Sequence, residues 1–124
     1  MPQINTDKGA LHFEVLDATP PWLDTPETIL FHHGVAIDSG IWAGWPPALS
    51  DRYRILTFDV RGYGRSNIPD ESFDWSFELL AEDVLAVADA AGVDKFHFVG
   101  ESMGGAMGLY LSIHHPGRLL SVTP

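Results

Sequence analysis

The 124-residue sequence contains no cysteine and few basic residues. Without cysteine there is no disulfide framework, no thiolate nucleophile and no cysteine-based zinc site. Seven Lys and Arg residues stand against seventeen Asp and Glu, which gives a formal net charge of −10. A charge of this sign repels phosphate backbones and anionic lipid surfaces, so it argues against nucleic-acid and membrane-surface roles.

The sequence also lacks an apolar run of membrane-spanning length and a basic N-terminal region followed by an apolar one. We therefore expect a soluble, cytoplasmic protein. The composition, 45% hydrophobic and 19% charged, is typical of a globular chain. Its length suffices for one domain with a substantial core and is too short for two.

Acidic residues are concentrated between positions 70 and 83. They could form a metal or cation site, but we favour a solvated loop and the outer face of a helix, because blocks of like charge usually face solvent. We accordingly expect no metal site. The stretch contains Asp70, Glu71, Asp74, Glu78, Glu82 and Asp83.

Short apolar runs alternate with helical patterns along the chain. In the second run Leu11, Phe13 and Val15 alternate with polar or small residues, which predicts a strand with one buried face. The predicted strands cover residues 3–6, 10–16, 28–32, 53–58, 95–99 and 118–122, with helices over 77–91 and 103–115 and a short helix or irregular turn within 41–50. Buried strands that alternate with helices predict the α/β class, with a mostly parallel sheet and helices on both faces.

The helix over 77–91 has the clearest pattern. Ser76 is a suitable N-cap and Gly92 a natural C-terminal stop. Apolar residues recur at spacings of three and four, which predicts one buried face. That face comprises Phe77, Leu80, Val84, Val87 and Ala91.

The sequence GESMGG, residues 100–105, lies between a predicted strand and a predicted helix. This is the context of a G-x-S-x-G nucleophile elbow, in which a sharp and strained turn exposes the serine hydroxyl. Gly100 and Gly104 would approach each other across the turn. We interpret Ser102 as a nucleophile and the Met103 amide as an oxyanion donor. The alternative is a tight strand–helix turn with an incidental serine.

The sequence FHHGV, residues 31–35, ends another predicted strand. Gly34 permits an abrupt turn, after which the Val35 amide could supply a second oxyanion donor. His33 could be a catalytic base, but we favour a structural hydrogen-bonding role that holds the loop. His32 is interpreted as packing.

The sequence DVRGYGRS, residues 59–66, follows a third strand. Its glycines could suggest a phosphate loop, but the spacing is neither G-x-G-x-x-G nor that of a Walker loop. We favour a structural turn tied by an Asp–Arg pair, with Asp59 and Arg61 as motif residues.

Together, FHHG, DVRGYGRS and VGESMGGAMG resemble the α/β-hydrolase superfamily, and the set is similar to that of its esterase, enol-lactonase and perhydrolase members. The resemblance implies that Ser102 is the nucleophile, that the Val35 and Met103 amides form the oxyanion hole, and that no cofactor is required. The turn over residues 59–66 resembles a scaffold element that carries no chemistry. The structural motif residues that we predict are His33, Gly34, Asp59, Arg61, Gly100 and Gly104.

The resemblance also implies a triad in the order Ser, Asp or Glu, then His. No Asp or Glu follows Ser102, and His114 lies about 18 Å away if the helix is regular, at ~1.5 Å per residue. We therefore expect residues 1–124 to form a single incomplete α/β-hydrolase domain, without cap and C-terminal strands. A complementary polypeptide that carries Asp and His is the favoured completion; truncation and a swap between two copies are the alternatives.

The expected function is that of a serine hydrolase acting on small carboxylic esters or lactones through an acyl-enzyme at Ser102. Perhydrolase or haloperoxidase activity could accompany it. Trp42 and Trp45 could line the site or pack in the core. The alternative is a non-catalytic ligand-binding or interaction module, or an inert fragment.

Overall fold

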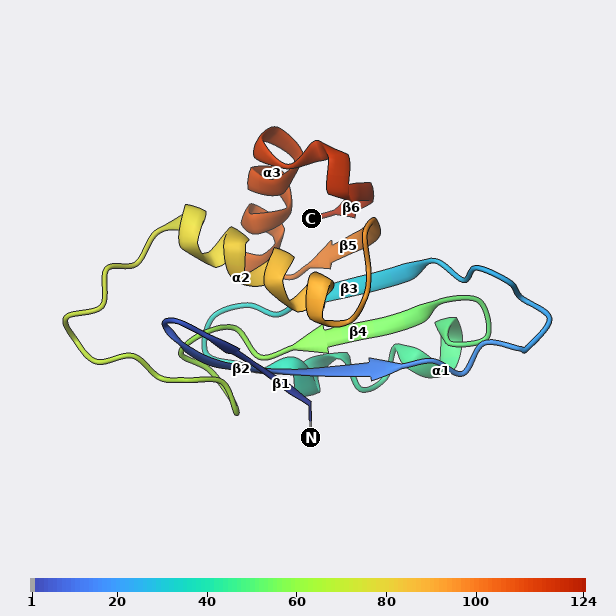
Figure 1. The fold of residues 1–124 in the computed structure, drawn as a ribbon, viewed down its shortest axis with the longest axis horizontal. Coiled ribbons are helices and arrows are strands. Elements are labelled where there is room, and N and C mark those ends of the chain that lie inside the picture. The colour runs from blue at the N-terminus through green and yellow to red at the C-terminus, as the bar shows by residue number, and fades with distance from the viewer. Residues whose placement is uncertain (1) are drawn as a thin grey trace.

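The computed structural model describes residues 2–124, which form a six-stranded sheet (Figure 1). The strand order is β1-β2-β4-β3-β5-β6. The first two strands form an antiparallel hairpin, β2 is antiparallel to β4, and the remaining pairs are parallel. The strands are β1 (Gln3–Thr6), β2 (Gly9–Leu16), β3 (Thr28–His32), β4 (Arg54–Phe58), β5 (Phe96–Gly100) and β6 (Leu119–Thr123). This confirms the predicted α/β class and mostly parallel sheet.

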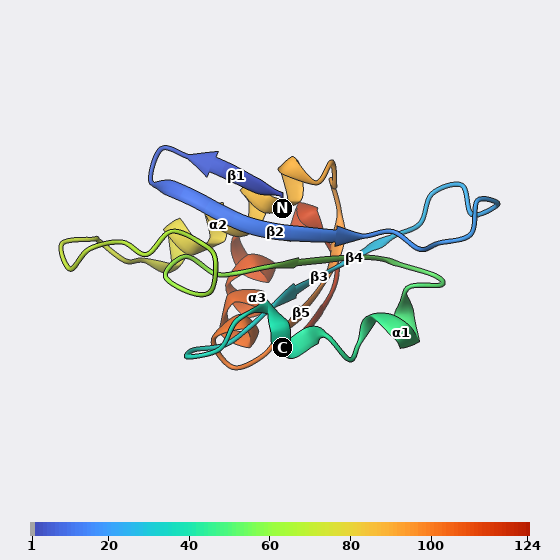
Figure 2. The same ribbon diagram turned by 90° about the horizontal axis from the view of Figure 1, so that it is seen from below.

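Helical segments cover both faces of the sheet, unequally (Figure 2). Two full helices, α2 (Phe77–Ala90) and α3 (Met103–His114), lie on one face. The other face is covered by two short segments, η1 (Ser39–Trp42) and α1 (Pro46–Leu49), and a last short helix, η2 (Pro116–Arg118), precedes β6. None of these helices is both long and apolar enough to span a membrane.

The core divides between the two faces because successive strand residues point to opposite sides. Leu30, Leu56 and Phe98 are fully buried in the cluster formed with α2 and α3. Their strand neighbours Ile29 and Ile55 belong instead to a smaller cluster beneath η1 and α1, which includes Trp42. Each central strand is therefore apolar on both faces, as the continuous apolar runs predict.

The alternation predicted for β2 is only partly correct. Leu11 and Phe13 are buried as expected, but Val15 is 43% exposed and His12 is 4% exposed. His12 is covered by the turn that follows β4, and its backbone amide donates a hydrogen bond to Ser66 Oγ in that turn (2.9 Å). Burial along this strand thus depends on contacts with neighbouring segments, which the period-two pattern of the sequence cannot predict.

The buried face predicted for α2 is also displaced. The Ser76 hydroxyl caps the helix by accepting from the Leu79 amide (3.1 Å), as predicted. Val84 and Val87 are buried, but Phe77 is 44% exposed and stacks on the Tyr110 ring of α3. The helix contacts both the sheet and α3, so its buried surface is set by two neighbours rather than by one apolar stripe.

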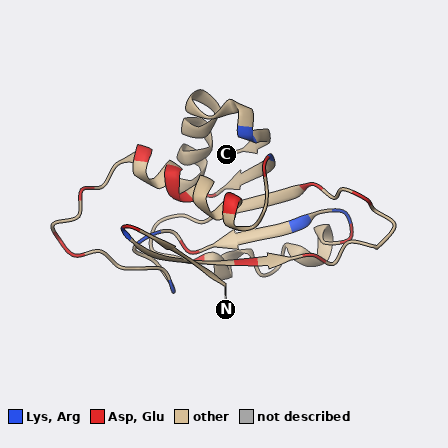
Figure 3. Cartoon of the chain, viewed as in Figure 1, with Lys and Arg blue, Asp and Glu red and all other residues tan. Residues whose placement is uncertain are grey.

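Five of the six acidic residues between positions 70 and 83 are exposed, and Figure 3 shows acidic positions along α2 and the loop before it. Asp83 is the exception, because only 6% of its surface is exposed. Its two carboxylate oxygens accept from Nε and Nη2 of Arg61, both at 2.8 Å. The prediction of a solvated face is therefore wrong for Asp83. Residues 2–124 contain no group of three or more His, Asp or Glu that could hold a metal.

Candidate active site

Three chain segments meet at the carboxyl edge of the parallel strands. His33 and Gly34 follow β3, Asp59 follows β4, and Ser102 follows β5. His32 is in register with Gly100 on the neighbouring strand, so the β3 and β5 turns begin side by side. Ligands of open parallel sheets bind at this edge.

Ser102 occupies a sharp turn between β5 and α3. Its backbone has φ 55° and ψ −109°, a region that L-residues adopt only when the surroundings impose it. The turn is fixed by the Glu101 amide, which donates to the His32 carbonyl (3.0 Å), and by the Gly104 amide, which donates to the Glu101 carbonyl (2.9 Å). Ser102 is exposed and its hydroxyl makes no helix-capping bond, so the strained turn expected from the motif presents a free hydroxyl.

The glycines of the turn allow two different close approaches. A Cβ on Gly100 would overlap the carbonyl group of Gly104 and lie 2.6 Å from the Gly105 nitrogen. A Cβ on Gly104 would instead overlap the His32 carbonyl of β3. We predicted that both glycines serve the contact across the turn. The structure shows that Gly104 is required mainly for the packing of α3 on β3.

The loop after β3 lies directly against the elbow. A Cβ on Gly34 would stand 3.0 Å from the Glu101 carbonyl oxygen and 3.1 Å from Ser102 Cβ. The amide of Val35 follows Gly34, and that of Met103 is the first of α3, where no intrahelical acceptor exists. Within residues 2–124 neither amide donates a hydrogen bond. Both amides thus remain candidates for the oxyanion donors predicted from the sequence.

Both ring nitrogens of His33 bind the backbone. Nε2 accepts from the Val60 amide (2.9 Å), so Nδ1 carries the proton and donates to the Gly34 carbonyl (2.8 Å). The ring is fully buried and packs edge-on against Tyr63. His33 therefore ties the loop after β3 to the turn after β4, and it has no free nitrogen with which to activate Ser102.

His32 is buried beneath the elbow between two aromatic rings. Its ring lies edge-on to Phe58 and tilted against Phe98. Nδ1 donates to the His33 carbonyl (2.8 Å), while Nε2 has no partner within residues 2–124. Burial lowers the pKa of His32 to about 4, so the ring is neutral at pH 7. The interpretation of His32 as packing thus omits a hydrogen bond that orients the carbonyl preceding Gly34.

The buried neutral state of His32 predicts an acid-sensitive fold. The folded pKa, about 4, lies below the unfolded value of 6.5, so between these values only the unfolded state binds the proton. Stability present at pH 7 is lost as the pH falls through this window, by about 2 kcal/mol at pH 5. We expect His32→Asn, whose amide can still donate to the His33 carbonyl, to remove this share of the pH dependence in urea unfolding at pH 7 and pH 5. His114→Asn, at an exposed histidine of α3, should keep the pH dependence of the unmutated protein. The same loss of unfolding free energy between pH 7 and pH 5 in the unmutated protein and both variants would contradict the assignment.

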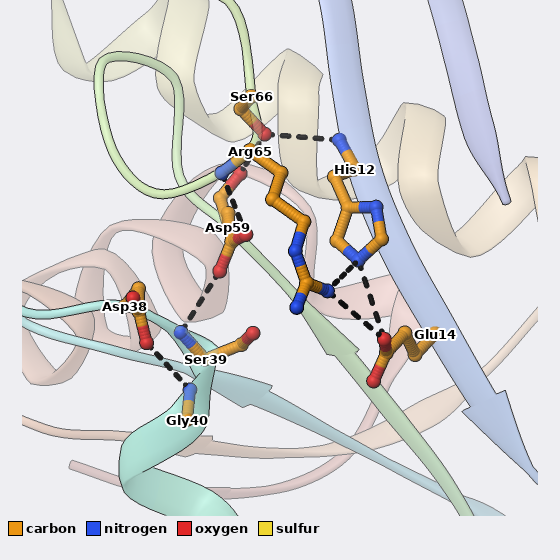
Figure 4. Close-up of polar contacts among 8 residues, drawn as sticks. All are labelled: His12, Glu14, Asp38, Ser39, Gly40, Asp59, Arg65 and Ser66. Carbon is orange, nitrogen blue, oxygen red and sulfur yellow. Dashed lines mark hydrogen bonds and ion pairs between the residues drawn. The ribbon is translucent and has the colours of Figure 1, made fainter. Parts of the chain in front are cut away.

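The turn over residues 59–66 links three segments (Figure 4). The Asp59 carboxylate accepts from the amides of Ser39 (2.9 Å) and Arg65 (3.0 Å). Burial acts to raise the pKa of Asp59, but hydrogen bonds from Arg65 and Ser39 outweigh it and hold the pKa below its ordinary value. The predicted Asp–Arg pair is wrong, because Asp59 binds amides and the Arg61 guanidinium binds Asp83. Ser39 was missed, although Asp38 before Gly40 is typical of a helix N-cap.

A cavity of about 610 Å³ lies between β2, β4 and η1, next to this turn. Asp59, Arg65 and Trp42 are among its lining residues, and Ser102 is not. Trp42 packs against Phe31 with ring centroids 4.8 Å apart and is 5% exposed, whereas Trp45 is 47% exposed. Core packing is therefore the observed role of Trp42.

The comparisons with known proteins agree with this geometry. The family model described as "alpha/beta hydrolase fold" matches residues 27–123. The chain is 38% identical over 95 residues to 3-oxoadipate enol-lactonase 1 of Acinetobacter baylyi, covering 77% of this chain and 35% of that protein. It is 32% identical over 97 residues to a fluoroacetate dehalogenase of a Burkholderia species, covering 76% and 32% respectively.

A crystal structure of the enol-lactonase from Burkholderia xenovorans superposes with a TM-score of 0.86 at 29% identity, covering 98% of this chain and 45% of that one. The chain thus spans about a third of the length of these curated relatives. The matched segment contains the loop after β3, the turn after β4 and the elbow after β5. The chain belongs to the α/β-hydrolase family.

Proposed function

We propose that this chain carries the nucleophile and oxyanion hole of a serine hydrolase that acts on carboxylic esters or lactones. The observation that carries the proposal is the backbone of Ser102, which has positive φ at a strand–helix turn and lies against the Gly34 loop. An exposed serine in this conformation is costly for the fold and is typical of a functional site. The name of the A. baylyi relative, an enol-lactonase, fits this substrate class.

In the proposed reaction Ser102 Oγ attacks the ester carbonyl and its proton passes to a histidine. The Val35 and Met103 amides bind the oxyanion of the tetrahedral intermediate. Collapse expels the alcohol, which takes the proton from the histidine, and leaves an acyl group on Ser102. Water activated by the same histidine then releases the acid.

The histidine and its carboxylate partner are proposed to come from outside residues 1–124. His33 uses both ring nitrogens for backbone contacts, and no acidic residue follows Ser102. In the A. baylyi relative the matched segment is continuous with the rest of a longer chain, so that relative gives no support for a separate complementary polypeptide.

We expect Ser102→Ala to abolish hydrolysis of a short-chain p-nitrophenyl ester wherever the Asp and His are supplied. Loss of a triad nucleophile reduces kcat by about 10⁶-fold in the subtilisin case. The measurement is release of p-nitrophenolate by the purified protein, with Ser112→Ala, an exposed serine of α3, as the matched control. Turnover by Ser102→Ala as fast as that of the Ser112→Ala control would refute the nucleophile assignment.

A non-catalytic binding module is the second candidate, because no general base contacts Ser102 within residues 2–124. A fluorophosphonate probe discriminates between the two, since it forms an adduct only with an activated serine. We expect the adduct on Ser102 once the Asp and His are present. Failure of the completed protein to react would favour the binding module.

A further inference from the structure

A second serine, histidine and carboxylate are hydrogen-bonded in series near the opposite edge of the sheet from Ser102. Nδ1 of His97 lies 2.7 Å from Ser121 Oγ, and its Nε2 lies 2.9 Å from Glu27 Oε1. Glu27 and Ser121 are exposed, and the His97 side chain is 25% exposed. Within residues 2–124 the cluster is open to small molecules, and no part of the elbow is involved in it.

Strand register brings the three residues together. His97 of β5 is in register with Ile29 of β3 on one side and with Ser121 of β6 on the other. Residues in register on neighbouring strands point to the same face, so the His97 and Ser121 side chains meet. Glu27 immediately precedes β3 and reaches the other ring nitrogen. The Tyr53 ring lies edge-on to His97, at 5.7 Å between centroids, and limits how the imidazole can turn.

The hydrogen bonds determine where the proton lies. An ionised Glu27 only accepts, so Nε2 of His97 carries the proton and donates to it. Nδ1 is then a lone pair, and it accepts the hydroxyl proton of Ser121. A nucleophile bonded to a base that is itself oriented by a third group is the arrangement that activates serine hydroxyls. Here the serine bonds Nδ1 and the carboxylate bonds Nε2.

We propose that Ser121 is a second nucleophilic site, one that reacts with small activated acyl or phosphonyl donors such as aryl esters and fluorophosphonates. Ser121 Oγ attacks the electrophilic carbon or phosphorus as its proton passes to His97 Nδ1, and Glu27 stabilises the imidazolium. The bond to the leaving aryloxide or fluoride breaks as the new bond to oxygen forms. The imidazolium then gives its proton to water or to the leaving group.

The site differs from the elbow in its surroundings. Ser121 lies within a strand and not at the start of a helix, where free backbone amides are available as oxyanion donors. Ser121 lines none of the three most prominent cavities within residues 2–124. We therefore expect slow acylation whose rate rises linearly with probe concentration and shows no saturation.

The test is exposure of the 124-residue chain to a fluorophosphonate, followed by trypsin and mass spectrometry. Cleavage after Lys95 and Arg118 places Ser102 and Ser112 on residues 96–118 and Ser121 on residues 119–124, so the two proposed sites are read separately. We expect an adduct on residues 119–124 that is absent in Ser121→Ala. His97→Gln should slow it at least ~10-fold, because general-base assistance contributes about 10²–10⁴-fold.

Glu27→Gln provides a second variant that preserves the size of the side chain and is expected to slow the adduct several-fold. Thermal melts of each variant establish that the fold is intact, and unmodified Ser112 is the internal control for nonspecific reaction. If the 119–124 peptide of the chain without substitutions carries no adduct, the proposal is overturned. The proposal would also be overturned if the His97→Gln and Glu27→Gln variants both fold and label Ser121 at the unchanged rate. Fragment-ion sequencing of the 96–118 peptide separates Ser102 from Ser112, and an adduct on Ser102 bears only on the elbow.

Discussion

Asp83→Ala is expected to lower the free energy of unfolding by about 3–5 kcal/mol, because it leaves the buried Arg61 guanidinium without its counter-ion. Arg61 is 1% exposed and forms two parallel hydrogen bonds of 2.8 Å with the Asp83 carboxylate. Its remaining donors reach Thr6 Oγ1 (3.2 Å) and the Lys8 carbonyl in the β1–β2 turn. The pair therefore joins the hairpin, the turn after β4 and α2.

Urea unfolding at pH 7 measures this effect, with Glu82→Ala as the matched control. Glu82 precedes Asp83 on α2, is exposed and forms no ion pair within residues 2–124. We expect the control to change stability by less than about 0.5 kcal/mol. In Arg61→Met combined with Asp83→Leu no buried charge remains, so much of the stability should return. A loss below 1 kcal/mol in Asp83→Ala would show that water reaches the guanidinium.

Gly104→Ala is expected to destabilise the fold by at least about 3 kcal/mol, at the upper end of the cost of overpacking. The added methyl group would overlap the His32 carbonyl, which is backbone in a central strand and has no room to move. In an exposed helix, replacing Gly by Ala raises the free energy of unfolding by up to about 1 kcal/mol. The loss of stability expected at Gly104 therefore comes from packing alone.

Gly117→Ala is the matched control for Gly104→Ala. A Cβ on Gly117 meets nothing within 4 Å, and we expect little change in its unfolding midpoint. Both variants are compared by thermal and urea unfolding. A Gly104→Ala protein as stable as the control would mean that α3 can move away from β3 at little cost, and that the elbow is less constrained than its backbone indicates.

Local pattern was sufficient for the architecture and for the position of the elbow. Period-two and period-3.6 patterns predict strands and helices from ten to fifteen consecutive residues, and Ser76 and Gly92 end α2 through contacts within four or five residues. The conformation of Ser102 was foreseeable for the same reason, because a glycine-rich turn between a strand and a helix restricts the backbone locally. Two errors, at Val15 and Phe77, arose where a neighbouring segment decided which side of an element is covered.

The sequence by itself determined the α/β class, the order of strands and helices along the chain, and the strained turn at Ser102. The tertiary structure alone decided which charged and polar groups meet. Arg61 and Asp83 are 22 residues apart and Glu27 and His97 are 70 apart, so neither contact leaves a periodic signal in the sequence. Such pairs form when strand register and helix docking carry distant residues to one face, and for the buried Arg61–Asp83 pair the loss of one partner is costly.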